Sequence, residues 1–301
     1  MRQFFGLSTG SQLLSLSQQW RISFITVGFA ILLLLLTAVA MTSVIILTVA
    51  VFAENIKGIS GEDTLYGTAE SDTISGFEDS DKLFGEEEDD FLEGGTGKDE
   101  IYGRDGNDEI KDGNDEPYSD NKVYGGSGND NIDVGIDYTL VDYYYVYGEA
   151  GSDYINVASN AFINGGSDDD TIYCTGYECI VNGDEGDDEI HAKLYDVGSS
   201  LSGGSGNDNL YFNGGGGYQS GDAGNDYLMV ISGGGNLHGG EGEDVLEALE
   251  GDNLYNGGPG ADTFNCSPGH GDIVEDYNPQ EGDTISADCE TVQDAPLPNI
   301  Q

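Results

Sequence analysis

Apolar residues recur along most of this chain at a fixed distance behind a glycine and an aspartate. The stretch GGTGKDEIYGRDGNDEIKDG, which begins at residue 94, shows units of nine residues that follow one another directly. Within each unit an aliphatic or aromatic residue stands between residues that are mostly polar, and this alternation is typical of a strand with one buried face. The pattern predicts short β-strands joined by glycine-rich turns from residue 58 to about residue 285.

Fourteen copies of the unit align on glycine at position 1, aspartate at position 6 and Ile, Leu or Phe at position 8. Glycine adopts left-handed backbone angles at little cost, so the glycines at positions 1, 2 and 4 predict a tight concave loop, here called a cup. Its carbonyl oxygens and the aspartate carboxylate are the ligands that Ca²⁺ prefers, about six to eight at a time. The candidate calcium ligands are Asp63, Asp72, Asp81, Asp90, Asp99, Asp108, Asp130, Asp153, Asp170, Asp188, Asp208, Asp226, Asp244 and Asp262.

This motif resembles the hemolysin-type, or RTX, calcium-binding nonapeptide G-G-x-G-x-D-x-U-x, which builds a parallel β-roll. The resemblance covers residues 58 to about 285, roughly three quarters of the chain. It implies an all-β solenoid that binds many calcium ions. Residues 260–290 resemble the closing unit that follows such repeats in the family, with a cysteine pair added.

The spacing of the copies predicts two unequal edges of the roll. Six copies start nine residues apart between residues 58 and 103. The later copies start 17–23 residues apart, and four of these eight intervals are 18 residues, which is one full turn. Eleven cups should therefore stack on one edge. The other edge should carry cups in the first three turns and degenerate loops after them, including bulges at 112–120 and 137–147. The gaps between stacked cups set a ceiling on the order of a dozen calcium ions.

The charge of the chain is extreme, with 57 acidic and 9 basic residues and a formal net charge of −48. Disorder and solubility at high salt are alternative explanations, but acids placed at loop positions beside aliphatic residues at fixed offsets favour a folded cation-binding protein. Nucleic acid is a poor partner for such a surface. Because like charges stack turn upon turn, we expect the roll to be largely unfolded without calcium.

Residues 22–53 contain no charged residue and exceed the span of about 20 residues that crosses a bilayer. A cleaved export signal and a retained single-pass membrane anchor remain equally open, and a leader helix is expected in either case. Both alternatives place residues 54–301 outside the cytoplasm, in a secreted or surface-anchored protein.

The same patterns divide the chain into four parts. Residues 1–53 form the signal peptide or anchor, and residues 54–256 form the calcium-binding β-roll. Residues 257–290 hold the last repeat and a C-terminal cap, and residues 291–301 are expected to be a flexible tail.

The four cysteines fall in a part of the chain that is expected to be oxidised. The pairs Cys174–Cys179 and Cys266–Cys289 are favoured because each is local along the chain, with four free thiols as the alternative.

No combination of residues predicts a catalytic site, so we expect a non-enzymatic protein with a structural, adhesive or cell-surface role. The three histidines share no metal-binding or catalytic spacing. The alternative function is calcium-dependent binding of extracellular polysaccharide through the tyrosine run at 143–147 and outward residues such as Tyr102, Tyr173 and Tyr211.

Overall fold

The computed structural model of the chain is a solenoid of β-strands, and among the residues it describes there is no helix. These residues lie in one compact unit, which begins at Ala53. Within them, no helix is long and apolar enough to cross a membrane. Apart from Ala53, the predicted leader at residues 1–53 lies outside the described part of the chain. The structure describes residues 53–113, 120–135, 143–158, 160–194, 198–269 and 271–294.

The described strands number 24 and most of them are short. In chain order they are β1 Asn55–Lys57, β2 Thr64–Tyr66, β3 Thr73–Glu78, β4 Lys82–Glu87, β5 Phe91–Thr96, β6 Glu100–Asp105, β7 Glu109–Lys111, β8 Asn121–Ser127, β9 Asn131–Val134, β10 Tyr143–Ala150, β11 Tyr154–Val157, β12 Asn160–Ser167, β13 Thr171–Gly176, β14 Cys179–Glu185, β15 Glu189–Leu194, β16 Ser200–Ser205, β17 Asn209–Ala223, β18 Tyr227–Glu241, β19 Val245–Ala248, β20 Leu254–Asn256, β21 Thr263–Asn265, β22 Ile273–Tyr277, β23 Thr284–Ile285 and β24 Thr291–Asp294.

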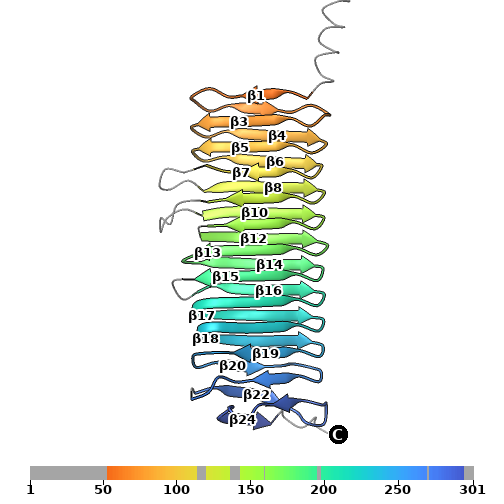
Figure 1. The fold of residues 1–301 in the computed structure, drawn as a ribbon, viewed down its shortest axis with the longest axis vertical. Helices are drawn as coiled ribbons and strands as arrows, with labels where there is room; N and C mark the ends of the chain where they lie inside the picture. The colour runs from red at the N-terminus through yellow and green to blue at the C-terminus, as the bar shows by residue number, and fades with distance from the viewer. Residues whose placement is uncertain are drawn as a thin grey trace, which may run out of the picture. The chain divides into compact units, whose positions relative to one another are not determined.

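Successive strands lie alternately on two faces of the roll (Figure 1). Face 1 holds the odd-numbered strands from β1 to β15 and face 2 the even-numbered strands from β2 to β16. Each strand pairs in parallel with the strand one turn away, as β4 does with β6 and β13 with β15. Strands β17 and β18 are 15 residues long and continue around one corner, so each contributes to both faces.

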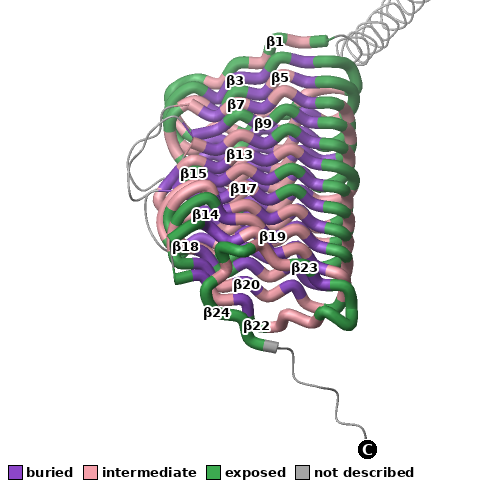
Figure 2. The backbone as a smooth tube through the Cα atoms, turned by 60° about the horizontal axis from the view of Figure 1, so that its bottom comes forward, coloured by how far each residue is buried: buried purple, intermediate pink, exposed green. Residues whose placement is uncertain are grey.

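The apolar residues at position 8 form the core between the two faces. Thirteen of the fourteen are fully buried, and Leu65 in the first turn is half-buried. Along most strands buried residues alternate with half-buried or exposed ones, so buried segments line up from turn to turn (Figure 2). The predicted all-β parallel β-roll is therefore confirmed.

The structure describes only part of the predicted bulges, because residues 114–119 and 136–142 lie outside the described ranges. At the C-terminal end, β24 pairs in parallel with β22. Residues 291–294, which the sequence assigned to the tail, are thus the last strand of the closing unit. The other tail residues, 295–301, are not described.

Candidate metal centres

The position-6 aspartates form two rows, one along each edge of the roll. On one edge, the backbone N–H of each aspartate donates a hydrogen bond to Oδ1 of the aspartate one turn further on, with N···O distances of 2.6–3.0 Å. The short row on the opposite edge links Asp63, Asp81 and Asp99 in the same way. The long row contains the other eleven predicted ligands and ends on a twelfth carboxylate absent from the prediction: Asp72, Asp90, Asp108, Asp130, Asp153, Asp170, Asp188, Asp208, Asp226, Asp244, Asp262 and Asp283.

The second carboxylate oxygen, Oδ2, is buried and without a hydrogen-bond partner at most of these aspartates. The side chains concerned are at most 3 % exposed. An ionised oxygen held away from water without a partner is strongly unfavourable, so each such atom is a candidate ligand for a cation. The residues are Asp81, Asp90, Asp108, Asp130, Asp153, Asp170, Asp188, Asp208, Asp226, Asp244 and Asp262.

Oxygens from two neighbouring turns converge on most of the position-1 glycines. A Cβ atom placed on Gly221 would lie 2.2 Å from Asp226 Oδ2 and 2.6 Å from the carbonyl oxygen of Gly239, one turn further on. The same point at Gly85 would lie 2.3 Å from Asp90 Oδ2 and 2.6 Å from the Gly103 oxygen. A side chain does not fit there. The distances from this point to the carboxylate and carbonyl oxygens are instead similar to those between Ca²⁺ and its ligands, which are about 2.3–2.6 Å.

Positions 2 and 4 of the cups adopt left-handed backbone angles. On the long row, all ten loops from Gly85 to Gly257 have φ between 65° and 158° at both positions. The carbonyl oxygens of these positions approach the next turn, since a Cβ atom on Gly240 would lie 2.0 Å from the oxygen of Asp222. Each gap between two turns is thus bordered by Oδ2 and two carbonyl oxygens from one loop and a position-1 carbonyl oxygen from the next.

This mixture of ligands explains why side chains alone do not reveal the sites. Nowhere in the described ranges do three or more His, Cys, Asp or Glu side chains form a group that could hold a metal ion. The backbone supplies most of the oxygens, and the carboxylate supplies the charge. This donor set is the one that Ca²⁺ favours.

The first loop of each row departs from this arrangement. Ile59 and Thr68 stand at position 2 and neither adopts a left-handed angle, which β-branched residues strongly disfavour. Their backbone N–H groups donate instead to Oδ2 of Asp63 and Asp72. These two predicted ligands are therefore partnered within their own loops. The ten regular long-row loops enclose nine gaps, and the short-row loops at Gly76 and Gly94 enclose one more. These ten gaps have the full set of oxygens and are called complete cups below.

Burial raises the pKa of the carboxyl groups in the cups. The pKa of Asp170 rises to about 8, and those of Asp108 and Asp208 rise to about 7, chiefly because the groups are desolvated. Neighbouring carboxylates raise these pKa values further, and the hydrogen bond that each carboxylate accepts from the preceding aspartate opposes the rise. A bound cation would reverse the shift, because it favours the ionised form.

We expect acid to replace calcium in part. Folded-state pKa values above the ordinary 3.8 mean that the protonated groups stabilise the fold below that pH, and that this contribution is lost as the pH rises through about 7. Without calcium, the circular dichroism spectrum should show more β-structure at about pH 5 than at about pH 8. In subsaturating calcium the dependence should reverse, because protons compete with the ion. Identical calcium-free spectra at both pH values would contradict this prediction.

The comparison with known proteins agrees with this geometry. The family model of the RTX calcium-binding nonapeptide repeat matches the chain in four copies, at residues 58–92, 84–111, 119–138 and 231–264. This chain is an RTX-type parallel β-roll. Calcium ions are its partner, as the repeats indicated. Among curated proteins, none matches this chain.

The RTX β-roll extends through the segment that the family model leaves unmatched. Residues 139–230 hold Asp153, Asp170, Asp188, Asp208 and Asp226 of the long row, with the same hydrogen bonds and the same unpartnered Oδ2 atoms as the matched copies. The opposite edge of this segment has lost its aspartates, which weakens the nine-residue pattern without changing the long-row cups.

The short row loses its carboxylates where the sequence predicted a degenerate edge. Asn121 accepts the N–H of Asp99, and the residues that follow at the equivalent place carry no carboxylate until Asp272. In order after Asp99, the residues at this place are Asn121, Tyr144, Ala161, Cys179, Ser199, Gly217, Gly235, Asn253 and Asp272.

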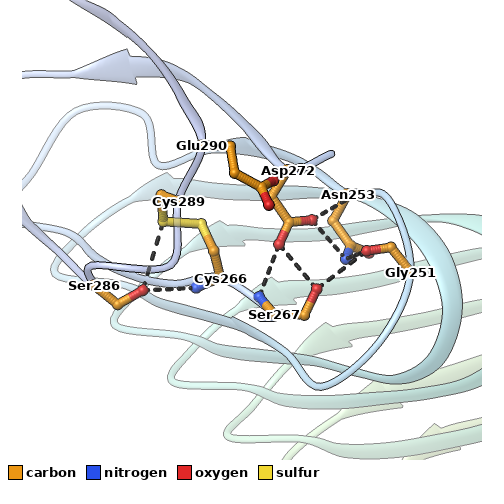
Figure 3. Close-up of a disulfide and its surroundings, with 8 residues drawn as sticks. All are labelled: Gly251, Asn253, Cys266, Ser267, Asp272, Ser286, Cys289 and Glu290. Atoms are coloured by element: carbon orange, nitrogen blue, oxygen red, sulfur yellow. Dashed lines mark hydrogen bonds between the residues drawn. A yellow bond between two sulfur atoms is a disulfide. The ribbon is translucent and has the colours of Figure 1, made fainter. Parts of the chain in front are cut away.

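Asp272 closes this edge with protein donors alone. One carboxylate oxygen accepts bonds from the backbone N–H and side-chain amide of Asn253 at 2.8 and 3.0 Å, and the other accepts from the N–H and hydroxyl of Ser267 at 2.8 and 2.9 Å (Figure 3). Both oxygens of this fully buried carboxylate are satisfied, unlike those of the cups. Asp272 therefore belongs to the cap and needs no cation.

Both favoured disulfides are confirmed, and both lie on the short-row edge. Cys174 and Cys179 are linked with their Cα atoms 6.4 Å apart, and Cys179 occupies the place of a short-row aspartate. Cys266 and Cys289 are linked with Cα atoms 5.1 Å apart, beside the Asp272 cluster (Figure 3). The edge with few cups thus has covalent links where the long row has ion sites.

The outward aromatic residues stack on one another along the roll. Tyr66, Phe84, Tyr102, Tyr124 and Tyr147 on face 2 form a ladder with ring centroids 4.7–5.0 Å apart and planes within 8° of parallel. On face 1, Tyr173 and Tyr211 stack on the two sides of His191. Most ring faces are therefore covered by the next ring, so these ladders do not present the open faces on which sugars stack.

Position 5 forms a further ladder on the long-row edge that sequence reasoning missed. The side-chain oxygen of Asn207 accepts the backbone N–H of Asn225 at 3.0 Å, and that of Asn225 accepts the N–H of Glu243 at 2.7 Å. The recurring Asn-Asp pairs at 107–108, 129–130, 207–208 and 225–226 carry this signal. The ladder satisfies the outer N–H groups, while the inner oxygens remain for the ion.

Proposed function

We propose that the RTX β-roll is an extracytoplasmic, non-enzymatic protein in which calcium holds the turns together, and that it serves a structural or adhesive role at the cell surface. The buried and unpartnered Oδ2 atoms carry the proposal, since they require cations for the fold to be stable at neutral pH. The apolar leader and the two disulfides support an oxidising location. Protection of the roll from external protease in intact, calcium-depleted cells would contradict that location.

The chain's own residues explain how an ion would stabilise the fold. In each complete cup, Oδ2 of the position-6 aspartate and the carbonyl oxygens of positions 1, 2 and 4 would hold Ca²⁺ between two turns. The ion offsets the repulsion between stacked carboxylates and joins one turn to the next. Because each turn contacts only its neighbours, stability should spread along the roll from cup to cup.

Asp208→Ala is expected to remove one of the ten ions and to lower the free energy of unfolding in calcium by about 2 kcal/mol. The substitution deletes Oδ2 from one gap and leaves the N–H of Asp188 without its acceptor. In chelator the variant and the parent chain should both lack ordered β-structure, so the difference in stability should appear only when calcium is present. Equilibrium dialysis and denaturant titration measure the two effects.

Asp252→Ala is the control on the short-row edge. The Oδ1 atom of Asp252 accepts the N–H of Gly271 at 3.0 Å. The place of a short-row aspartate is taken by the next residue, Asn253, whose Oδ1 accepts the N–H of Gly235. This variant should bind as much calcium as the parent chain. An equal loss of calcium in both variants would contradict the assignment of the ions to the long row.

A further inference from the structure

The short-row loop at Gly76 carries a side chain that is unusual for its backbone. Phe77 stands at position 2 with φ of 85°, in the left-handed region that glycine favours. Other non-glycine residues at this position in regular loops are polar, such as Glu86, Arg104 and Asp222. A bulky aromatic residue held there is a genuine outlier, and such outliers gather at functional positions.

Phe77 is also exposed, and it has an exposed apolar neighbour. Its side chain is 45 % exposed, and Ile59, at the same position one turn earlier, is 71 % exposed. The bridge between Ser60 and Glu78 fixes the register that places these two residues on adjacent turns. The next residue at this position is Gly95, whose missing side chain leaves Phe77 uncovered from that direction.

The pair lies at the N-terminal end of the roll, where other features suit a lipid surface. Tyr66, 56 % exposed, belongs to the same two turns, and so does the exposed Lys57. Aromatic residues and lysine are typical of the boundary between water and a bilayer. The apolar stretch that we expect to enter a bilayer ends at residue 53, and β1 begins at Asn55.

We propose that Ile59 and Phe77 insert into a phospholipid surface when calcium orders the loop that carries Phe77. The inference rests on the proposed calcium-binding function, because the left-handed loop that projects Phe77 closes around the ion site of Asp81. Since the roll is strongly acidic, the surface expected is zwitterionic, with apolar insertion in place of attraction between charges.

A single tryptophan tests the contact. The only tryptophan of the chain is Trp20, so Phe77→Trp in residues 53–301, which form a compact unit of their own, gives one reporter. With phosphatidylcholine vesicles carrying brominated acyl chains, calcium should cause about a twofold loss of its fluorescence. Tyr218→Trp, at a site 43 % exposed far along the roll, is the matched control and should not be quenched.

Phe77→Gly supplies the second variant. Glycine adopts the left-handed angle freely, so this variant should fold and bind calcium as well as the parent roll. Its partition onto the same vesicles, measured by sedimentation, should fall about tenfold. Unchanged partition, or equal quenching at positions 77 and 218, would overturn the lipid contact. A roll that binds no calcium would overturn the proposed function itself.

Discussion

Gly148→Val is expected to divide the RTX β-roll into two weakly coupled halves. A Cβ atom on Gly148 would lie 2.2 Å from Asp153 Oδ2 and 2.4 Å from the carbonyl oxygen of Gly165, so the side chain fills the place where two ligands converge. The variant should lose the ion of that gap and about 3 kcal/mol or more of stability in calcium. Because stability passes from turn to turn, denaturant unfolding should change from one transition to two.

Glu149→Gly, one residue further on, is the matched control. Glu149 has φ of 80°, and its charge raises the pKa values of Asp130 and Asp153. Glycine removes both the backbone strain and the repulsion, so this variant should be as stable as the parent or more stable by up to about 1 kcal/mol. Similar destabilisation by both substitutions would show that position 1 has no special role in the cups.

Removal of the Cys266–Cys289 disulfide is expected to have the second large effect. The bond spans 23 residues and links the last repeat to the closing unit, so its loss as Cys266→Ser with Cys289→Ser should cost about 3 kcal/mol. The loss should appear first as faster hydrogen exchange in β22 and β24, which form the end of face 2. Calcium should not restore this protection, because Asp272 is already satisfied by Asn253 and Ser267.

The Cys174–Cys179 disulfide provides the comparison. It spans five residues in the middle of the roll, where long-row cups hold both neighbouring turns. Replacing both cysteines with serine should cost less, about 2 kcal/mol, and exchange at the C-terminal end should not change. Equal effects on β22 and β24 from the two disulfides would contradict a separate role for the closing unit.

The repeat itself made the fold and the long row predictable from sequence. The fixed distance between Asp208 and Leu210, repeated in fourteen copies, couples a ligand position to a buried position. Spacings of nine and eighteen residues then assign the copies to edges without further information. The pairing of Cys174 with Cys179 followed in the same way from their short separation.

Features that depend on contacts between turns could not be predicted. Asp283 and Asp272 continue the two rows at distances of 21 and 19 residues, so irregular spacing hid them. Ile59 and Thr68 look like ordinary variants of position 2 until their N–H groups are seen to bond Asp63 and Asp72. In these cases the register between neighbouring turns decides the role of the residue, and the amino-acid sequence alone does not give that register.

Stacking of the tyrosines is a further example. Outward aromatic residues such as Tyr102 suggest a face for sugars when they are read one at a time. Parallel register places Phe84 and Tyr124 on its two sides, and the rings then cover one another. The outward direction of Tyr102 was predictable, while the accessibility of its ring face was not.

The most direct measurement is the far-ultraviolet circular dichroism of residues 53–301 during calcium titration at neutral pH. We expect little ordered β-structure in chelator and a cooperative gain of β-signal that saturates when about ten ions are bound per chain. A β-signal already complete in chelator, and unchanged by added calcium, would contradict this expectation and show that the buried carboxylates do not need the ion.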